Sequence, residues 1–358
     1  MNDKDYKSCS SCFFSEKFPG VVIEKNGRCN FCNHGDFKAR KERQTTLDIT
    51  ELHRIAEELK KERKGKYDCI IGASGGLDSS YVIYIARKIL QLNPLVIKYD
   101  HGFNYSLAAS NLETICKQLG IDFKIVQSSK KYDLKYIRSM VLALRDLDVY
   151  WGICGFCHYI LLAVVYKYAL EENISTIFYS GNLYQSRLYL RRDFKLKFML
   201  RNLRKLSIAK LARLVFYMMI AQYYFVRLKL EFYVPPLSNI LRSRVKMREN
   251  IKLLNVTRYV RWDIDEMVKA MEEEMGWRKP REPKLPMRFD CKIEDSLINH
   301  TYTKAVGLTV QGIICNNLIY DGIRTKSELR DTVQKYNDDV VQEMRQMLSD
   351  LKLDYKEK

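Results

Sequence analysis

The chain has 358 residues, of which 47% are hydrophobic, so it is long enough to bury a sizeable core and is not a disordered polypeptide. Its formal net charge of +18 and pI near 9.3 indicate an anionic partner, such as nucleic acid, a membrane surface or a phosphorylated substrate. The N-terminus lacks an apolar signal core, and no apolar run reaches the ~20 residues of a membrane span, so we expect a cytoplasmic protein.

The first cysteines of the chain form two CxxC pairs, Cys9 with Cys12 and Cys29 with Cys32. Each CxxC turn directs two thiolates toward one point, and two such turns complete a tetrahedral four-sulfur site that is typical of structural zinc. The ten cysteines as a set suit metal sites in a reducing cytosol better than a disulfide framework. We therefore expect a zinc-ribbon module over residues 1–45, with Zn²⁺ bound by these four side chains.

After the cysteine module, helices and strands are expected to alternate. Residues 47–64 carry apolar side chains at helical spacing, and residues 68–73 are a short apolar run typical of a buried parallel strand. The further strands are expected at 95–99, 123–126 and 174–179, and the further helices at 80–92, 106–119, 132–147 and 158–171. This order predicts an α/β fold in which helices cover both faces of a parallel sheet, with ligands at the carboxyl ends of the strands.

The strongest signal is the run Ser-Gly-Gly-Leu-Asp-Ser-Ser at residues 74–80, between a predicted strand and a predicted helix. Glycines without Cβ atoms let the backbone wrap closely around an anion, and the N–H groups of the turn and the helix start point at phosphate oxygens. We assign Asp78 to Mg²⁺, because a carboxylate would repel a phosphate. The run lacks the Gly-Lys-Ser/Thr of a Walker A motif, so we expect ATP to yield AMP and pyrophosphate. An ordinary glycine turn with a capped helix is the alternative.

In this strand–turn–helix context, residues 74–80 resemble the loop of the pyrophosphatase-loop ATPases, which adenylate a carbonyl or carboxylate oxygen. The resemblance implies an adenine nucleotide alpha-hydrolase-like ATP-binding domain over residues 46–185, in which Asp78 is catalytic. Asp100 and Gly181–Asn182 lie where that family closes its nucleotide pocket, although a plain turn role is the alternative for them. The residues expected to bind ATP are Ala73, Ser74, Gly75, Gly76, Asp78, Ser79, Ser80, Asp100, Gly181 and Asn182.

A third CxxC pair, Cys154 and Cys157, opens a predicted helix, where thiols are expected to have lowered pKa values. We assign both as candidate catalytic residues, which could bind a metal ion, bind an Fe–S cluster with Cys291 as a third ligand, or act in sulfur transfer. A three-cysteine cluster leaves one iron position open, as in some ATP-dependent tRNA thiolation enzymes. A pair of packed, reduced cysteines is the alternative.

Residues 187–229 make the protein basic, because they hold twelve Lys or Arg and a single acid. Within them, residues 206–230 predict a very apolar helix with basic flanks, which suits a helix lying in an anionic membrane interface. A buried core or dimer helix is the alternative. The flanking basic residues are Lys210, Arg213, Arg227 and Lys229. We treat residues 186–233 as a basic, apolar helical insertion and residues 234–358 as a helical C-terminal region.

The N-terminal CxxC…CxxC module, the loop at 74–80 and the midchain CxxC together are similar to the N-acetyl sugar amidotransferase family of bacterial surface-polysaccharide assembly. Further matching stretches are residues 100–104, 180–182, 276–277, 290–291 and 321–329. The resemblance implies adenylation of a carboxyl or acetamido oxygen of an N-acetylated sugar, linked to a nucleotide or a lipid carrier. Ammonia from a partner glutaminase would then displace AMP, in lipopolysaccharide O-antigen or related synthesis. The alternatives are a tRNA 2-thiolation enzyme of the same superfamily, with tRNA as its partner, a noncatalytic membrane-bound nucleotide sensor, and an enzyme that adenylates a free amino acid.

Overall fold

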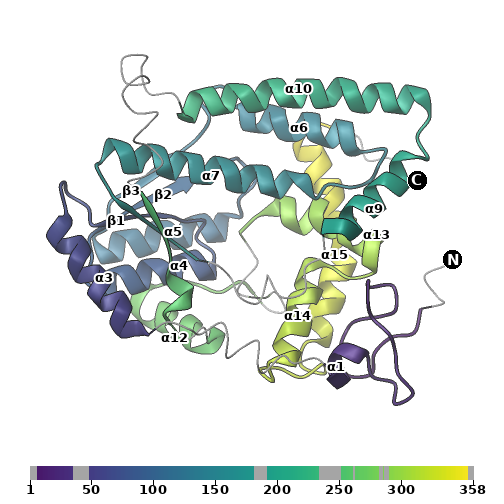
Figure 1. Ribbon diagram of the computed structural model, residues 1–358, viewed down its shortest axis with the longest axis horizontal. Coiled ribbons are helices and arrows are strands. Elements are labelled where there is room, and N and C mark those ends of the chain that lie inside the picture. The colour runs from purple at the N-terminus through teal and green to yellow at the C-terminus, as the bar shows by residue number, and fades with distance from the viewer. Residues whose placement is uncertain are drawn as a thin grey trace.

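The computed structural model describes residues 6–34, 48–180, 192–233, 251–260, 263–281, 285 and 290–353 (Figure 1). Its described strands form a five-stranded parallel sheet with the order β3-β2-β1-β4-β5. The strands are β1 (Cys69–Gly72), β2 (Pro94–Tyr99), β3 (Phe123–Val126), β4 (Thr176–Tyr179) and β5 (Lys252–Asn255). In the central register, Ile71 of β1 lies opposite Val96 of β2 and Phe178 of β4. The α/β fold class expected from the sequence is confirmed.

Alternate side chains of the strands enter two separate cores, which is why helices cover both faces of the sheet (Figure 1). Ile70 and Ile97 point to the face covered by α7 (Gly152–Glu171). Ile71 and Val96 point to the opposite face, which α4 (Leu77–Tyr84) and α5 (Ser106–Leu119) cover. Because parallel strands are buried on both sides, the sequence of β1 is continuously apolar rather than alternating.

Most predicted elements lie at nearly the predicted bounds, and α5 and β3 match them fully. The helix after the glycine loop begins at Leu77, three residues earlier than predicted, and continues as a π-helical turn, η2 (Ile85–Ile89). The remaining helices on the sheet side of the molecule are α3 (Ile49–Glu62), α6 (Tyr132–Leu144) and α12 (Ile264–Met275). In the C-terminal part they are η3 (Val256–Arg258), η4 (Glu294–Ile298), α13 (Asn299–Val306), α14 (Val310–Tyr320) and α15 (Arg330–Asp350).

The sequence analysis missed β5, the edge strand that pairs with β4. It is only four residues long, and its Leu253 side chain is 47% exposed, so it lacks the apolar signature of the inner strands. The sheet therefore takes a strand from beyond residue 233, within the predicted C-terminal region. The division of the chain at residues 45, 185 and 233 stays a prediction.

The most apolar long helix is α7, which corrects the expectation that no segment has the length and composition of a membrane span. Among the described residues it is the one helix that passes that test, with a mean hydropathy of 1.6. It packs against β1, β2 and β4 and against α10 (Ile208–Tyr233). This packing buries 39% of its apolar stretch, and side chains such as Tyr159 and Leu162 stay partly exposed.

Candidate functional site

The glycine-rich loop joins the carboxyl end of β1 to the start of α4, as the sequence predicts. Ser79 Oγ accepts the backbone N–H of Ser74 at 3.2 Å, and Ser74 Oγ accepts the N–H of Gly76 at 3.3 Å. From the C-terminal part of the chain, the indole N–H of Trp277 donates to the carbonyl of Gly75 at 3.2 Å. These bonds hold the loop in one shape before any ligand binds, which lowers the cost of binding one.

Gly75 is the position in this loop where only glycine fits. Its φ is +91°, a left-handed conformation that side chains with a Cβ rarely adopt. A Cβ added there would lie 1.8 Å from the carbonyl oxygen of Ala108 in α5. The backbone of the loop and that of α5 therefore touch directly.

We expect Gly75→Ala to lower the melting temperature by about 5 °C or more, because the clash is with backbone and cannot be relieved by a rotamer change. Gly152→Ala is the matched control, since a Cβ at Gly152, the first residue of α7, would meet nothing within 4 Å. Thermal unfolding followed by circular dichroism compares the two variants. Equal melting temperatures for both would contradict the close approach of the loop to α5.

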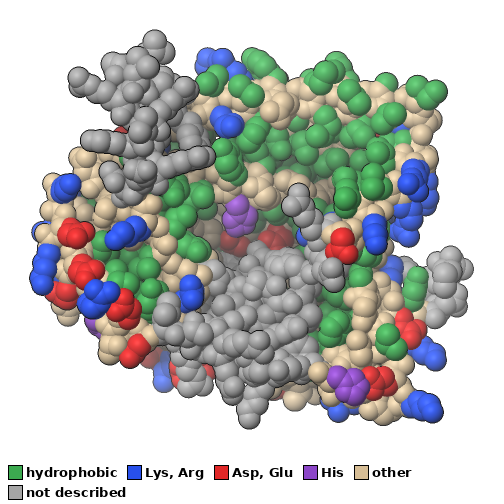
Figure 2. Space-filling view, in the orientation of Figure 1, with side chains coloured by type: hydrophobic (Ala, Val, Ile, Leu, Met, Phe, Trp, Pro, Cys, Tyr) green, Lys and Arg blue, Asp and Glu red, His purple; other side chains and the backbone are tan. Residues whose placement is uncertain are grey.

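A cavity of about 510 Å³ lies beside the loop, at the carboxyl ends of β1 and β4. One side is formed by the loop, the other by apolar side chains of α7, and its charged lining consists of two carboxylates, Asp78 and Asp290. No Lys or Arg is among the described residues that line it. Figure 2 shows a hollow below α7 in which a histidine and acidic side chains are visible. The described lining residues include Ser74, Gly76, Asp78, Ser79, His158, Leu161, Leu162, Val165, Tyr179, Ser180 and Asp290.

Asp290 reaches this cavity from the C-terminal part of the chain. Residues 290–292 run antiparallel beside 103–105, with Cys291 bridging to Asn104 and the N–H of Lys292 bonded to the carbonyl of Phe103 at 2.9 Å. The Asp290 carboxylate then lies about 3.5 Å from the position that a Cβ on Gly76 would take. The sequence analysis named Asp290 within a matching stretch but did not assign it to the site, and it did not assign His158 either.

The predicted ATP-binding residues of the loop fall into two groups. Ser74, Gly76, Asp78 and Ser79 line the cavity. Ala73, Gly75 and Ser80 are buried, and the Ser80 hydroxyl has no hydrogen-bond partner in the described part of the chain. The latter three residues shape the loop, so any phosphate contact from them would come from backbone N–H groups. Gly181 and Asn182 lie outside the described residues.

Asp100 organises the turn that follows β2. One carboxylate oxygen accepts the N–H of Gly102 at 2.9 Å and the side-chain amide of Asn104 at 3.0 Å, and the other accepts Gln127 Nε2 at 2.6 Å. Burial acts to raise the pKa of Asp100, but these donors outweigh it and hold the pKa below its usual value. Asp100 is not among the described residues that line the cavity, so its geometry matches the turn role weighed as the alternative.

The structure brings Cys154, Cys157 and Cys291 together from α7 and from the segment after residue 289. Burial raises the pKa of Cys291 well above its ordinary value, and the nearby charges of Cys154 and Cys157 raise it further. Burial also raises the pKa of Cys157 to about 12, with Asp133 adding to the effect. The expected lowering of the pKa at the helix start is therefore wrong for Cys157, because desolvation outweighs the helix dipole.

Lys195, from α9 (Arg192–Leu203), is a neighbour of this cysteine group that the sequence did not indicate. Its Nζ lies 5.6 Å from the ring centroids of both Trp151 and Tyr302. Burial lowers the pKa of Lys195, and the charge of Cys154 acts in the opposite direction. Helix α9 thus contributes a lysine that packs on Trp151, the residue just before α7.

The four N-terminal cysteines form a compact group that could hold a metal ion, with all four sulfurs within 4.8 Å of one another. Cys9 Sγ lies 3.7 Å from Cys32 Sγ, and Cys12 Sγ lies 3.8 Å from Cys29 Sγ. A tetrahedral ion with Zn–S bonds of about 2.3 Å requires sulfurs about 3.8 Å apart. The sulfur positions therefore fit a closed four-thiolate site. The thiol of Cys32 and burial raise the pKa of Cys12, as expected where thiols crowd together without a cation.

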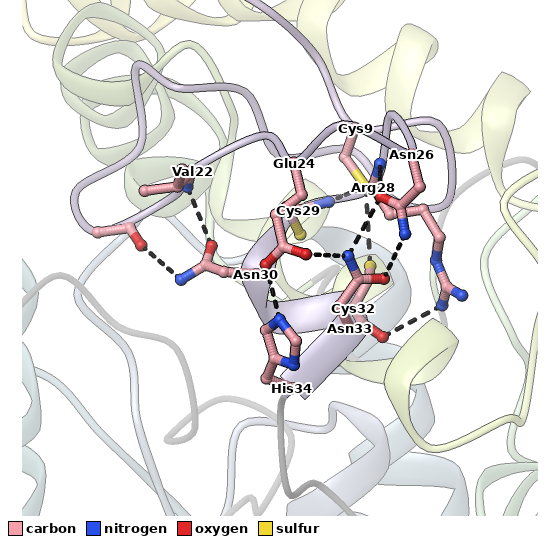
Figure 3. Close-up of polar contacts among 11 residues, drawn as sticks. Cys9, Val22, Glu24, Asn26, Arg28, Cys29, Asn30, Cys32, Asn33 and His34 are labelled. Carbon is pink, nitrogen blue, oxygen red and sulfur yellow. Dashed lines mark hydrogen bonds and ion pairs between the residues drawn. The ribbon is translucent and has the colours of Figure 1, made fainter.

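Backbone and neighbouring groups orient these sulfurs. The N–H groups of Cys29 and Ser11 donate to Cys9 Sγ at 3.2 Å and 3.4 Å, and the Tyr320 hydroxyl lies 3.3 Å from Cys12 Sγ. Figure 3 shows the polar contacts around Cys9, Cys29 and Cys32, with His34 turned away from the sulfurs. His34 pairs with Glu24 at 2.8 Å instead, so it is no ligand of this site. Tyr320 belongs to α14, so the module is docked on the C-terminal helices.

Comparisons with known proteins give little similarity. No protein-family model matches the chain. An uncharacterized protein of Methanocaldococcus jannaschii, MJ1599, is 34% identical over 76 residues, which is 21% of this chain. The chain spans about a quarter, 27%, of that relative's length. This local match assigns neither a family nor an activity.

Among the solved structures that align with the chain, three have TM-scores too low to carry an argument about it. The U34-tRNA thiolase NcsA of Methanococcus maripaludis, with its 4Fe-4S cluster, is 16% identical, covers 97% of this chain and 90% of its own, and has a TM-score of 0.36. The NH3-dependent NAD synthetase of Campylobacter jejuni is 17% identical over 53% of this chain and 96% of its own, at 0.29. The NMN synthetase of Francisella tularensis is 16% identical over 57% and 98%, also at 0.29. The assignment of this site therefore depends on its own geometry.

Proposed function

We propose that the protein is an ATP-dependent enzyme that cleaves ATP to AMP and pyrophosphate. The observation that carries the proposal is the preformed glycine loop, which opens into a cavity at the carboxyl ends of parallel strands. Backbone N–H groups at the start of α4 would bind phosphate oxygens. Asp78 would hold Mg²⁺, and no lysine in the described lining stands where a Walker loop places one on the β- and γ-phosphates.

We propose further that the enzyme is an amidotransferase acting on an N-acetylated sugar in surface-polysaccharide synthesis. The sugar oxygen would be adenylated, ammonia from a partner glutaminase would form the new C–N bond, and the C–O bond to AMP would break. Asp290 is our candidate for taking the proton that ammonium must lose, since its carboxylate lies in the cavity beside the loop. The two carboxylates of the described lining, Asp78 and Asp290, suit Mg²⁺ and ammonium. The reaction would take place in the cytoplasm.

The test is AMP and pyrophosphate release from ATP, measured with ammonium present against a panel of N-acetylated uronic acid sugars and against bulk tRNA. We expect release that depends on a sugar and yields a sugar amide or acetamidino sugar. Release of ADP and phosphate would contradict the adenylation proposal itself. Release stimulated by tRNA alone would replace the sugar by tRNA and keep the adenylation.

A second candidate function, tRNA 2-thiolation, is favoured by the grouping of Cys154, Cys157 and Cys291 near the cavity. Three neighbouring cysteines, each of them partly exposed, could hold an Fe–S cluster. In that case, protein purified anaerobically should be brown and contain iron and sulfide in addition to any zinc. A colourless, iron-free protein with full sugar-dependent activity would eliminate the cluster and leave these cysteines a packing role.

A further inference from the structure

The outward face of α10 is apolar over most of its length. Its inner face is buried on α6 and α7 through Ala221, Leu228 and Phe232. The opposite face exposes a line of large apolar side chains three or four residues apart, of which Met219 is 61% exposed. The line consists of Leu211, Val215, Met219, Tyr223, Val226 and Leu230. At a rise of 1.5 Å per residue it is about 29 Å long, and no described residue covers it.

Basic side chains border this apolar face. Residues 192–233, which span α9, α10 and the turn between them, contain ten Lys or Arg and two acids. Lys197, Arg204 and Lys205 are exposed, and within the described ranges none of them pairs with an acid. One of the two acids, Glu231, is already bound to Ser128 and Ser129. Figure 2 shows hydrophobic side chains along α10 and basic ones at the end of the molecule where Figure 1 places α9.

The apolar face continues from α10 onto α7 and reaches the cavity. Tyr159 and Leu162 of α7 are exposed by 37% and 39%. Leu162 also lines the cavity beside the glycine loop. Figure 2 shows the hydrophobic surface running from α10 down over α7 toward the hollow. A flat apolar body in contact with α10 would therefore lie next to the candidate active site.

We propose that α10 docks flat on an anionic lipid bilayer, with its outward apolar side chains in the interface and the exposed basic side chains of α9 and of the turn after it at the headgroups. An apolar face with a basic border is complementary to such a surface in both polarity and charge. A second copy of the chain fits less well, because pairing two copies of this face would bring basic borders together. Nucleic acid would contact the basic groups but leave the apolar line exposed. The proposal goes beyond the proposed chemistry and does not depend on it.

The experiment is cosedimentation of the full chain with phosphatidylcholine vesicles, with and without phosphatidylglycerol, at low and high salt. We expect binding only to the vesicles with phosphatidylglycerol, and weaker binding at high salt. The triple variant Lys197→Glu, Arg204→Glu, Lys205→Glu should weaken partitioning about 100-fold, given ~1 kcal/mol for each basic group at the surface. The double variant Val215→Asp, Met219→Asp leaves the basic side chains of α9 in place and should also weaken partitioning, because it makes the apolar line polar.

The matched control reverses the charge of three exposed lysines that lie away from this face, in the triple variant Lys61→Glu, Lys64→Glu, Lys117→Glu. Its change in net charge is the same. It should keep vesicle binding close to that of the wild type. Equal weakening in the control, or a wild-type chain that stays in the supernatant with anionic vesicles at low salt, would overturn the proposal. So would light scattering that shows a dimer in solution which Val215→Asp, Met219→Asp dissociates. ATP cleavage measured without vesicles is a separate readout, so a failed docking proposal leaves the proposed function intact.

Discussion

Asp78→Asn should lower ATP cleavage by at least about 100-fold while the protein stays folded. The side chain lines the cavity at the first turn of α4, where it would hold Mg²⁺, and a neutral amide is a much weaker ligand for that cation. The two side chains have nearly the same shape, and loss of an acid at a helix start costs only about 0.3–1 kcal/mol. AMP and pyrophosphate release, followed across a range of Mg²⁺ concentrations, measures the effect. Partial recovery at high Mg²⁺ is expected.

Asp338→Asn is the control for this variant, because Asp338 lies exposed on α15 and does not line the cavity. It should leave turnover unchanged. Asp290→Asn should also lower turnover, but without recovery at high Mg²⁺ if Asp290 takes a proton rather than binding the cation. If the Asp78→Asn variant cleaved ATP at the wild-type rate, the proposed role of Asp78 in binding Mg²⁺ would be contradicted.

Cys29→Ser should remove the bound metal ion and unfold the N-terminal module. The four sulfurs are spaced for one tetrahedral ion, and we expect it to be zinc. Structural zinc contributes ~10–16 kcal/mol in small peptides, so loss of one of four thiolates should cost a large part of the module's stability. Metal analysis should give one Zn²⁺ per wild-type chain and almost none in the variant. Limited proteolysis should then cut within residues 6–34.

Cys116→Ser is the matched control, since Cys116 is a buried cysteine of α5 outside the four-sulfur group. It should keep the zinc and the proteolytic resistance of the wild type. A wild-type chain free of zinc after purification without chelators would contradict the assignment of the metal. ATP cleavage should fall less in Cys29→Ser than in Asp78→Asn, because the sulfur group contacts α14 rather than the cavity.

Elements with strong local patterns could be predicted from the sequence. The apolar run of β1, the helical spacing of α5 and the glycine turn between β1 and α4 are encoded by neighbouring residues, so their existence and order follow from periodicity and turn chemistry. The short edge strand β5 could not be predicted, because four half-exposed residues carry no such pattern. Its place in the sheet depends on pairing with β4.

The candidate site likewise has parts that could be predicted from the sequence and parts that could not. The four N-terminal cysteines converge as predicted, because each CxxC turn fixes its own geometry and two turns are enough to build the group. Lys195 and Asp290 could not be predicted as neighbours of the site. Each belongs to a segment that lies more than 40 residues away along the sequence from the residues it contacts, so only tertiary packing brings it there.

By itself, the sequence of this protein determined the α/β class, the glycine loop and the cysteine group, because each depends on contacts between residues close together in the chain. The tertiary structure alone decided that Gln127 donates a hydrogen bond to Asp100 and that burial raises the pKa of Cys157, since both depend on what other segments place around these side chains. It also decided which face of α10 is exposed. Its sequence is apolar almost all round, so only packing on α6 and α7 separates the buried side from the outward one.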